Sequence, residues 1–367
     1  MTKVSEKKLV VLTAGGTGGH VYPAEALAGE LIKRGYRVVL FTDERGLNNY
    51  KGKLGEIENK AILSGSVVGK SVLIKIKSLF KVSLGVIQAF IELFKQHPVC
   101  VVGFGGYASF PTAIASILHG VPLIIHEQNS VMSRTNRILS RFASLIAQSF
   151  RNVKNTPSTV KEVLCGMPVR EAIVNLHKNN FEPYDKNGKF VLFVVGGSQG
   201  AKVFADIVPE AIAELSKEEQ KNLVIYQQCR KGEEDMIAEK YKGMSCEVVI
   251  RSFFDNMPEL YEKASVVVSR SGASSVYEIA IAGVPCILVP LPSSADNHQY
   301  FNALEFSESG GGIIIEQKDL SAKIMSRKIS DFMKNPELLK KMSAKLKKRA
   351  ITDAAKRLAD EVEKFAK

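Results

Sequence analysis

The sequence contains no tryptophan, and its five cysteines never stand in a C-x-x-C pair. Most of these cysteines lie in or beside apolar runs, which is typical of free core thiols in a protein from a reducing compartment. The histidines show no metal-ligand spacing with one another or with the cysteines. We therefore expect no disulfide framework and no metal ion, and no pattern indicates any other cofactor.

Long apolar runs are also missing, since no stretch of about 18 apolar residues is available to cross a bilayer. The polar start of the chain, MTKVSEKKL, has no signal-peptide pattern. Charge is unbalanced, with a formal net charge of +12, and this excess favours phosphorylated substrates or an acidic membrane surface. Nucleic acid is not an expected partner, because the basic residues are spread out and no tryptophan can stack on bases.

The length of 367 residues suggests two domains, and both halves alternate short apolar strands with helices. A polar stretch over residues 171–188 indicates a linker, which places the domains at 1–170 and 171–350. This alternation predicts an α/β protein with two doubly wound parallel sheets and a cleft between the domains. The expected strands are Leu9–Thr13, Arg37–Thr42, Val99–Val102, Leu123–His126, Val163–Gly166, Lys189–Val195, Leu223–Gln227, Glu247–Ile250, Val266–Ser269, Val284–Val289 and Gly312–Glu316.

One stretch of the second half carries the clearest signal of a site. A strand at Val266–Ser269 leads into a turn of small residues over 270–275, and an apolar helix follows from Val276 to Ala282. Ligands of parallel sheets lie where such a turn opens a helix, and free N–H groups there bind phosphate. The turn adds the Arg270 guanidinium, and Glu278 can accept from the two hydroxyls of a ribose. We therefore expect a nucleotide-sugar site.

Two glycine-rich turns follow other predicted strands. They are AGGTGGH at residues 14–20 and GGSQGAK at residues 196–202. Glycines let the backbone approach a ligand closely and present its N–H groups. Polar side chains at Glu127, Gln128 and Asn129 follow a further strand end, where sites of α/β proteins lie.

Two other motifs look like nucleotide-binding fingerprints. Residues 65–71, GSVVGKS, are one residue too short between the glycines for a P-loop, so we do not expect ATP cleavage. Residues 103–108, GFGGYA, fit G-x-G-x-x-A after a strand. An isolated match of this length is weak evidence, and we do not expect NAD binding.

A long helix is predicted over Lys70–Lys95, with an apolar stripe at helical spacing and a separate basic face. Two interpretations stay open: a surface that docks on anionic lipid, or a core helix with a solvated basic flank. The stripe consists of Leu73, Ile76, Phe80, Leu84, Ile87, Ile91 and Phe94, and the basic face includes Lys70, Lys77 and Lys81.

Six motifs follow one another along most of the chain. They are GGTGGHVYPA (15–24), HEQNS (126–130), GMPVR (166–170), GGSQGAK (196–202), SRSGASSVYEIAIAGVP (269–285) and DNHQYFNA (296–303). Together and in this order they resemble the MurG family of bacterial peptidoglycan glycosyltransferases. One glycine loop alone would be weak evidence, whereas all six are specific.

The resemblance implies a GT-B fold, in which two Rossmann-like domains flank a cleft and the last helix, here in residues 351–367, packs on the first domain. It implies an inverting transfer of N-acetylglucosamine from UDP-N-acetylglucosamine to the C4 hydroxyl of the muramyl sugar of lipid I, which is undecaprenyl-pyrophosphoryl-MurNAc-pentapeptide. The product is lipid II of peptidoglycan. No D-x-D metal motif is present, as expected for an enzyme that holds UDP without a metal. A lipid-linked acceptor implies a peripheral enzyme on the cytoplasmic face of the inner membrane, docked on anionic lipid through the helix Lys70–Lys95.

Carried over by motif, the resemblance places substrate binding on residues from both halves. The turn at 273–275 and the loop that holds Ser198 can bind diphosphate oxygens at helix N-termini, and Arg170 can neutralise the departing UDP. Phe254 stands where the family often has an aliphatic residue, and Ser275 where a threonine is frequent. The full set is Thr17, Gly18, Gly19, Asn129, Arg170, Ser198, Phe254, Ala273, Ser274, Ser275, Glu278 and Gln299.

An inverting transfer needs a base that takes the proton of the acceptor hydroxyl. His20 is the first candidate for this catalytic residue, because imidazole titrates near neutral pH and its loop faces the predicted cleft. Glu127 is the second candidate. A histidine that only orders its loop stays an alternative for His20.

Two other functions stay open. The first is a GT-B glycosyltransferase that acts on another lipid or on a soluble acceptor; the motifs GGTGGH and HEQN of the first domain argue against it. The second is a catalytically idle UDP-sugar-binding protein that holds partners at the membrane. The presence of His20, Glu278 and Gln299 argues against the second.

Overall fold

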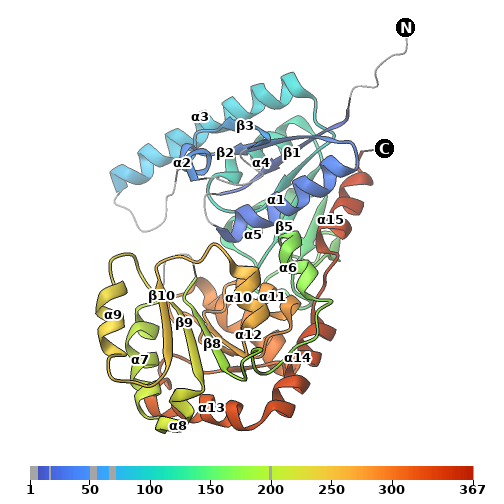
Figure 1. Ribbon diagram of the computed structural model, residues 1–367. Helices are drawn as coiled ribbons and strands as arrows, with labels where there is room; N and C mark the ends of the chain where they lie inside the picture. Colours follow the sequence, from blue (N-terminus) through green and yellow to red (C-terminus); the bar gives the residue numbers. More distant parts are fainter. Residues whose placement is uncertain (1–6, 16–17, 50–55, 66–71, 198–200, 367) are drawn as a thin grey trace. The chain divides into compact units, whose positions relative to one another are not determined.

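The structure is a computed structural model, and it describes residues 7–15, 18–49, 56–65, 72–197 and 201–366. The chain divides into two compact units (Figure 1). Unit 1 comprises Met1–Arg170 and Asp353–Lys367, and unit 2 comprises Glu171–Thr352. The chain therefore leaves unit 1, builds unit 2 and returns to unit 1 at its C-terminal end.

Unit 1 is built on a sheet whose strands are Leu9–Thr13 (β1), Arg37–Thr42 (β2), Glu58–Ala61 (β3), Cys100–Gly103 (β4), Leu123–Glu127 (β5), Leu145–Gln148 (β6) and Glu162–Leu164 (β7). Their order is β3-β2-β1-β4-β5-β6-β7, and every pair is parallel. This confirms the predicted doubly wound sheet. The strands β3 and β6 were not predicted; β3 has the polar sequence ENKA, and most of its residues are exposed.

The helices of unit 1 are Gly18–Lys33 (α1), Glu44–Asn49 (α2), Val72–Gln96 (α3), Ser109–His119 (α4), Arg134–Leu139 (α5), the 3-10 turn Ser140–Phe142 (η2) and Ala354–Glu363 (α15). Alternate residues of a strand point to opposite faces of the sheet. Val10 and Leu12 of β1 therefore pack into one cluster with α1 and α15, whereas Leu9 and Val11 pack into another with α3 and α4.

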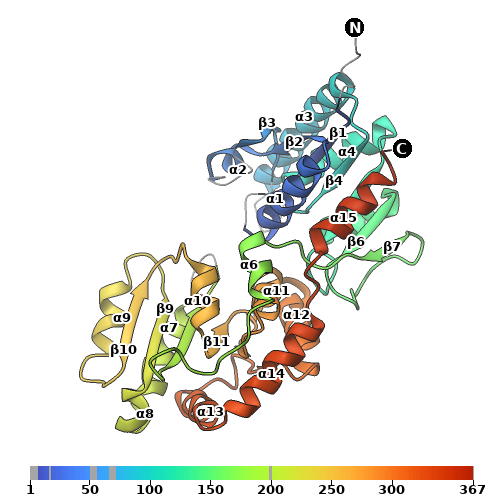
Figure 2. The ribbon, with the colours of Figure 1, turned by 45° about the vertical axis from the view of Figure 1, so that its right-hand side comes forward.

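Helix α15 is an integral part of unit 1, although it lies at the end of the sequence. Leu358 and Val362 are fully buried against α1 and the sheet, and burial of each side chain stabilises the unit by about 1.5–3 kcal/mol. The two helices lie side by side in both Figure 1 and Figure 2.

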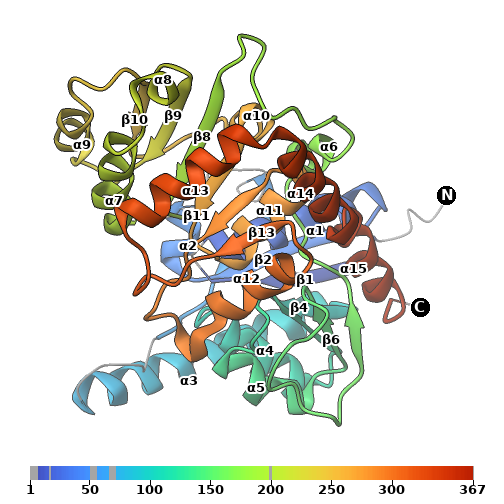
Figure 3. The same cartoon turned by 90° about the horizontal axis from the view of Figure 1, so that it is seen from below.

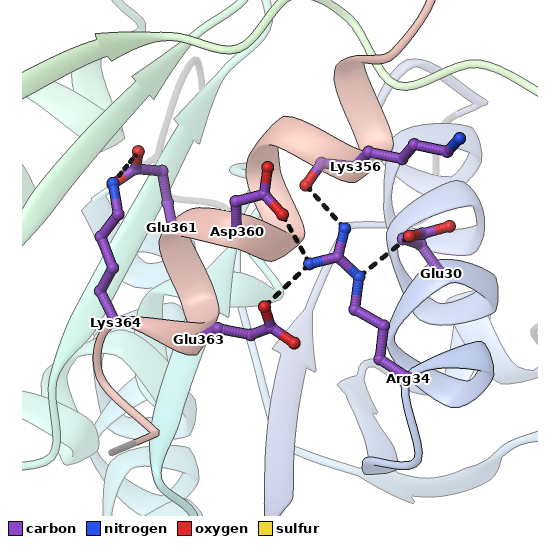
Figure 4. Close-up of polar contacts among 7 residues, drawn as sticks. All are labelled: Glu30, Arg34, Lys356, Asp360, Glu361, Glu363 and Lys364. Carbon is purple, nitrogen blue, oxygen red and sulfur yellow. Dashed lines mark hydrogen bonds and ion pairs between the residues drawn. The ribbon is translucent and has the colours of Figure 1, made fainter.

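Arg34, just after α1, fixes the orientation of α15 (Figure 4). Its Nε donates to Glu30 at 2.9 Å, its Nη1 to Asp360 at 2.7 Å and to Glu363 at 3.0 Å, and its Nη2 to the carbonyl of Lys356 at 3.2 Å. Asp360 and Glu363 are substantially exposed. Water screens such pairs, so we attribute most of the docking energy to apolar burial and the docking angle to Arg34.

Unit 2 has a second sheet, with strands Phe190–Val195 (β8), Leu223–Gln228 (β9), Glu247–Arg251 (β10), Val266–Ser269 (β11), Cys286–Leu288 (β12) and Gly312–Ile314 (β13). The order is β10-β9-β8-β11-β12-β13, again with parallel pairs throughout. This is the strand order of a dinucleotide-binding doubly wound fold. The predicted fold class is therefore confirmed in both units.

The helices of unit 2 are Glu171–Leu176 (α6), Lys202–Ala213 (α7), Lys217–Lys221 (α8), Glu234–Lys240 (α9), Met257–Lys263 (α10), Ala273–Ala282 (α11), the 3-10 turn Ala295–Asn297 (η3), His298–Glu308 (α12), Ala322–Lys334 (α13) and Pro336–Arg349 (α14). Helix α13 packs beside α7 on one face of the sheet (Figure 3). The prediction that residues 171–188 form only a linker is wrong. They begin with α6, whose Ile173 and Leu176 are buried.

Within the described part of the chain, no helix has both the length and the apolarity needed to cross a membrane.

Candidate functional site

The candidate site of unit 1 lies where the strand order of its sheet reverses. β1 and β4 pair in parallel, with Thr13 beside Gly103, so the loops that follow these two strands leave the sheet together. The backbone N–H of Gly15 donates to the carbonyl of Gly105 at 3.3 Å. Ligands of doubly wound sheets bind at such a switch point. The loop predicted as AGGTGGH and the motif GFGGYA are therefore neighbours.

His20 stands in the first turn of α1 and contacts the second of these loops. A Cβ atom placed on Gly105 would lie 3.4 Å from the ring Cε1 of His20, and one placed on Gly106 would lie 3.4 Å from its Cδ2. Both glycines have φ near +80°, a conformation that side chains rarely tolerate. The imidazole therefore rests on bare backbone.

The pKa of His20 is lowered, mainly because burial disfavours the charged ring. The carbonyl of Phe104 and the side-chain amide of Gln128 partly oppose this shift. Nδ1 of His20 is buried and has no hydrogen-bond partner within the described residues. A neutral imidazole with an unused nitrogen is chemically able to take a proton.

Glu127 is fully buried at the end of β5, and its own loop uses both of its oxygens. Oε1 accepts from the backbone N–H of Asn129 at 2.9 Å, and Oε2 accepts from the N–H of Ser133 at 3.0 Å and from Nδ2 of Asn136 at 2.7 Å. Burial raises the pKa of Glu127, and these hydrogen bonds oppose the rise. This geometry favours a role in holding Asn129 and α5 over a role as the base.

A second buried histidine, His126, lies behind the loop. Its Nε2 lies 3.2 Å from the carbonyl of Gly166 and 3.3 Å from Oγ of Ser149, and Nε2 of Gln128 lies 3.2 Å from its Nδ1. Burial lowers the pKa of His126 to about 4, so the ring is neutral near pH 7. His126 belongs to the motif HEQNS, but no role was predicted for its side chain.

Arg170 is the last residue of unit 1, and its guanidinium lies over the ring of Tyr22, with Cζ 4.7 Å from the ring centroid. Tyr22 lies just beyond the first turn of α1, close to Gly19 and His20 in sequence. A helix N-terminus and a guanidinium both favour an anion. The predicted role of Arg170 toward a departing phosphate is therefore consistent with its position beside this turn.

Unit 2 has its own switch point, where Val195 of β8 pairs with Ser269 of β11. The turn after β11 opens α11 at Ala273, and no side chain caps the helix N-terminus. The first N–H groups of a helix have no partner within it. Oγ atoms of Ser271 and Ser274 are also buried without a partner among the described residues. This cluster of unused donors can hold phosphate oxygens.

Glu278 and Gln299 lie on the two helices next to this turn. Glu278 of α11 is largely buried and accepts from the hydroxyl of Tyr261 at 3.3 Å. Oε1 of Gln299 accepts from the backbone N–H of Leu291 at 3.0 Å. Asn302, which the prediction omitted, donates to the carbonyl of Ser271 at 3.1 Å and thereby ties α12 to the turn.

The expectation that the Arg270 guanidinium serves this turn is wrong. Nη1 donates to the carbonyls of Val289 and Pro290, both at 3.1 Å, and Nη2 donates to Gln317 at 2.6 Å. Burial also lowers the pKa of Arg270. The side chain joins the segments after β12 and β13, and the turn depends on backbone N–H groups and hydroxyls for its binding capacity.

Phe254 also differs from a ligand-facing residue. Its side chain is buried, with ring centroids 5.8 Å from Phe193 and 6.4 Å from Tyr226. Its neighbour Phe253 is 61% exposed. Only the backbone of Phe254 is thus available to a ligand. The sequence signal for this is that neighbouring side chains of an extended segment point in opposite directions, so that only one of Phe253 and Phe254 can be buried.

The remaining predicted residues fall into two groups. Ala273 and Ser275 lie in the first turn of α11, and Gly18 and Gly19 open α1. Thr17 and Ser198 lie outside the described residues.

Comparison with known proteins matches two family models to the chain. The glycosyltransferase family 28 N-terminal domain matches residues 10–148, and the glycosyltransferase family 28 C-terminal domain matches residues 191–358. The two models thus fall on the two sheets, and the fold is that of a GT-B glycosyltransferase.

Curated relatives carry the name UDP-N-acetylglucosamine–N-acetylmuramyl-(pentapeptide) pyrophosphoryl-undecaprenol N-acetylglucosamine transferase. The relative from Rhodospirillum rubrum is 40% identical over 96% of this chain and 90% of its own length. The relative from Agrobacterium fabrum is 40% identical over 98% of this chain and 95% of its own. A crystal structure of Acinetobacter baumannii MurG superposes with a TM-score of 0.78 at 29% identity, over 97% of this chain and 99% of that one.

The burial of His126 predicts a pH-dependent loss of stability. The unfolded chain takes up a proton near pH 6.5, whereas the folded ring does so only near pH 4. As pH falls between these values, protonation favours the unfolded state by about 1.4 kcal/mol per pH unit. The free energy of unfolding of the wild type therefore falls as the pH is lowered, and we expect His126→Gln to remove up to about 3 kcal/mol of this decrease. Urea unfolding at a series of pH values measures it.

The matched control is His97→Gln, since His97 is exposed in the same unit. Parallel pH dependences for the wild type and His126→Gln would contradict the assignment of a neutral buried ring.

Proposed function

The chain belongs to glycosyltransferase family 28, among the UDP-N-acetylglucosamine–N-acetylmuramyl-(pentapeptide) pyrophosphoryl-undecaprenol N-acetylglucosamine transferases, and from this premise we propose its reaction. The enzyme transfers N-acetylglucosamine from UDP-N-acetylglucosamine to the C4 hydroxyl of the muramyl sugar of lipid I. The products are lipid II and UDP.

The observation that carries this proposal is the pair of complementary half-sites at the two switch points. The turn of α11 supplies unused N–H groups and hydroxyls, as a diphosphate requires. The first turn of α1 supplies a neutral imidazole with a free nitrogen, as deprotonation of a hydroxyl requires. Transfer needs both units to hold their substrates at the same time.

In the proposed chemical step, the C4 oxygen of the acceptor attacks the anomeric carbon of the donor. The bond between that carbon and the phosphate oxygen breaks, and UDP keeps the electron pair. The acceptor proton passes to His20, and attack opposite the leaving group inverts the anomeric configuration. His20 is assigned the base role in preference to Glu127, whose oxygens are already occupied.

Donor binding is divided among groups of distinct chemistry. The N-terminus of α11 holds the diphosphate, and Glu278, one helical turn further on, accepts from the ribose hydroxyls. Arg170 and the N-terminus of α1 stabilise the charge that develops on the departing UDP. These roles follow from position and charge, with support from the relatives' shared name.

The acceptor's undecaprenyl chain places it in a membrane, and we propose that α3 is the docking surface on an anionic bilayer. Six of the seven side chains predicted as one apolar stripe of α3 are exposed, as this proposal requires, and the side chain of the seventh, Leu73, lies outside the described residues. Ile76, Phe80 and Phe94 are 62%, 64% and 62% exposed, and Lys77 and Lys81 are exposed beside them. A peripheral enzyme on the cytoplasmic face follows from this proposal and from its lipid substrate.

The direct test of the function is release of UDP from UDP-N-acetylglucosamine with and without lipid I. We expect release only with lipid I, and a lipid product heavier by one N-acetylhexosamine in mass spectrometry. Release of UDP with a different lipid or a soluble acceptor would instead identify the protein as a glycosyltransferase for that acceptor. Donor binding without any turnover would support an idle binding protein.

Glu278→Ala should raise the KM for UDP-N-acetylglucosamine by at least about tenfold, because one to two hydrogen bonds from the ribose to a charged group are lost. The matched control is Tyr261→Phe, which removes only the hydroxyl that donates to Glu278. Steady-state kinetics with both variants makes the comparison. An unchanged donor KM in Glu278→Ala would remove this carboxylate from the donor site.

Changing Lys70, Lys77 and Lys81 together to Glu should weaken binding to anionic vesicles by more than about tenfold, since each lysine near such a surface contributes roughly 1 kcal/mol. Lys70 lies outside the described residues. Cosedimentation with phosphatidylglycerol vesicles measures the change. The control variant carries Lys340→Glu and Lys341→Glu on α14, which also replace positive with negative side chains. Equal losses in both variants would place the docking surface elsewhere.

A further inference from the structure

Gln228 is the last residue of β9, a strand that none of the six sequence motifs covers. In the sheet of unit 2, β9 lies between β8 and β10, and ligands of such sheets bind outside the carboxyl ends of the strands. The turn after β8 begins with Gly196 and Gly197, and the turn after β10 contains residues 252–254. Gln228 therefore stands between two turns that the sequence assigns to donor binding.

The side-chain amide of Gln228 hydrogen-bonds to the backbone of both turns. Its Oε1 accepts from the N–H of Gly196 at 3.1 Å, and its Nε2 donates to the carbonyl of Ser252 at 3.3 Å. Because a backbone N–H only donates and a carbonyl only accepts, the orientation of the amide is determined. The side chain is 7% exposed, and a buried hydrogen bond is stronger than one that faces water.

The turn after β10 has a second anchor of a different kind. The ring of Phe254 packs against Phe193 of β8 and Tyr226 of β9, with ring centroids 5.8 Å and 6.4 Å apart. This packing holds the turn on the sheet. Gly196 has no side chain to pack in this way, so its position depends on backbone contacts such as the hydrogen bond to Gln228.

A nucleoside diphosphate places a particular demand on these two turns. Its base and its diphosphate are joined through one ribose, so the protein groups that contact them must lie at a matching separation. The turn after β8 leaves the sheet beside the turn of α11, since Val195 pairs with Ser269, and the α11 turn has the unused donors that suit a diphosphate. A site that is already held at the right spacing loses less free energy on binding.

We propose that Gln228 is a positioning residue for the donor: its amide fixes the separation between the turn that begins at Gly196 and the turn at residues 252–254, so that one UDP-sugar is bound through its base and its diphosphate together. This inference rests on the proposed function, which requires a UDP-sugar in unit 2. Gln228 itself is assigned no contact with the donor. Its loss therefore weakens UDP, which spans both turns, more than uridine, which lacks the diphosphate.

The first variant is Gln228→Met in the full-length protein, because it keeps the length of the side chain and removes the amide. We expect the Kd of UDP to rise about tenfold, as for the loss of buried hydrogen bonds. The Kd of uridine should rise less than about threefold, because Phe254 still anchors its turn. Calorimetry measures both ligands. In steady-state transfer the donor KM should rise with the Kd of UDP, while kcat changes by less than about threefold, since the proposed base lies in unit 1.

Gln228→Asn is the second variant, because it keeps a polar amide in the buried position. Its side chain is one methylene shorter, so it cannot reach both turns. We expect the same separation between the effects on UDP and on uridine as in Gln228→Met.

The matched control is Gln220→Met, which removes a buried amide just before the opposite, amino end of β9. Nε2 of Gln220 donates to the carbonyls of Ile212 and Leu215, both at 3.0 Å, and its Oε1 accepts from the N–H of Ser245 at 3.2 Å. We expect Gln220→Met to lower stability in urea unfolding but to change the Kd of UDP by less than about twofold. Equal weakening of UDP in Gln220→Met and Gln228→Met would show a general loss of stability and would overturn the proposal.

Phe254→Ala provides a comparison in which only the turn at residues 252–254 is released. We expect the Kd values of uridine and UDP to rise by similar factors in this variant, because the turn that contacts the base is itself displaced. If Gln228→Met gives the same pattern, Gln228 holds this turn alone and its role in the spacing is wrong.

The outcomes for the donor site and for the reaction are separable. If the wild type transfers the sugar to lipid I but the Kd of UDP in Gln228→Met stays within twofold of the wild type, this inference fails alone. If the wild type binds UDP without transfer to lipid I, the proposed function fails, and the two Kd values still decide the role of Gln228. If the wild type binds no UDP, both fail.

Discussion

The parallel pairing of the central strands is the constraint on which the rest of the structure depends. In each unit the first strand of the sheet pairs with the fourth, so that β1 lies beside β4 and β8 beside β11. Parallel pairing brings the carboxyl ends of both strands to one edge. In unit 1 His20 follows β1 in the sequence, and in unit 2 the turn after β11 opens α11.

The buried polar groups at these edges are of two kinds: those that hydrogen-bond within the protein, and those that have no partner in it. A buried polar group is costly unless it is hydrogen-bonded, and most of those found here are satisfied. The carboxylate of Glu127 accepts hydrogen bonds from its own loop and from α5. The guanidinium of Arg270 donates to the segments that follow β12 and β13. Among the described residues, the buried groups at these edges without a hydrogen-bond partner include Nδ1 of His20 and the hydroxyls of Thr13, Ser271 and Ser274.

Much of the fold could be predicted from the sequence, because apolar runs bounded by glycine turns determine strands of a parallel sheet. The strands at Leu9–Thr13, Arg37–Thr42 and Val266–Ser269 were predicted with the bounds that the structure has. The strand β3 was missed because it is polar and lies at the edge of the sheet, where burial does not select apolar residues. The helix α6 was missed because its six residues are too short for a helical period to stand out.

The candidate site was predictable in its loops but less so in its side chains. The motifs located the turns at the switch points, because glycines let the backbone approach a ligand closely and N–H groups at a helix N-terminus bind phosphate. The directions of individual side chains depend on packing partners far away in sequence. Arg270 turns toward Gln317, and Phe254 turns into the core beside Phe193. The exposure of the α3 stripe likewise depends on which face of α3 meets the sheet, and spacing alone does not determine this.

The measurement that tests the central claim most directly separates chemistry from donor binding in His20→Ala. Turnover to lipid II is followed in the steady state, and binding of UDP-N-acetylglucosamine is followed by calorimetry. If His20 is the base, kcat falls by roughly 10²–10⁴-fold, as for loss of a general base, while the donor Kd changes by less than about threefold. Retained turnover, or a loss that appears entirely as weaker donor binding, would contradict the account.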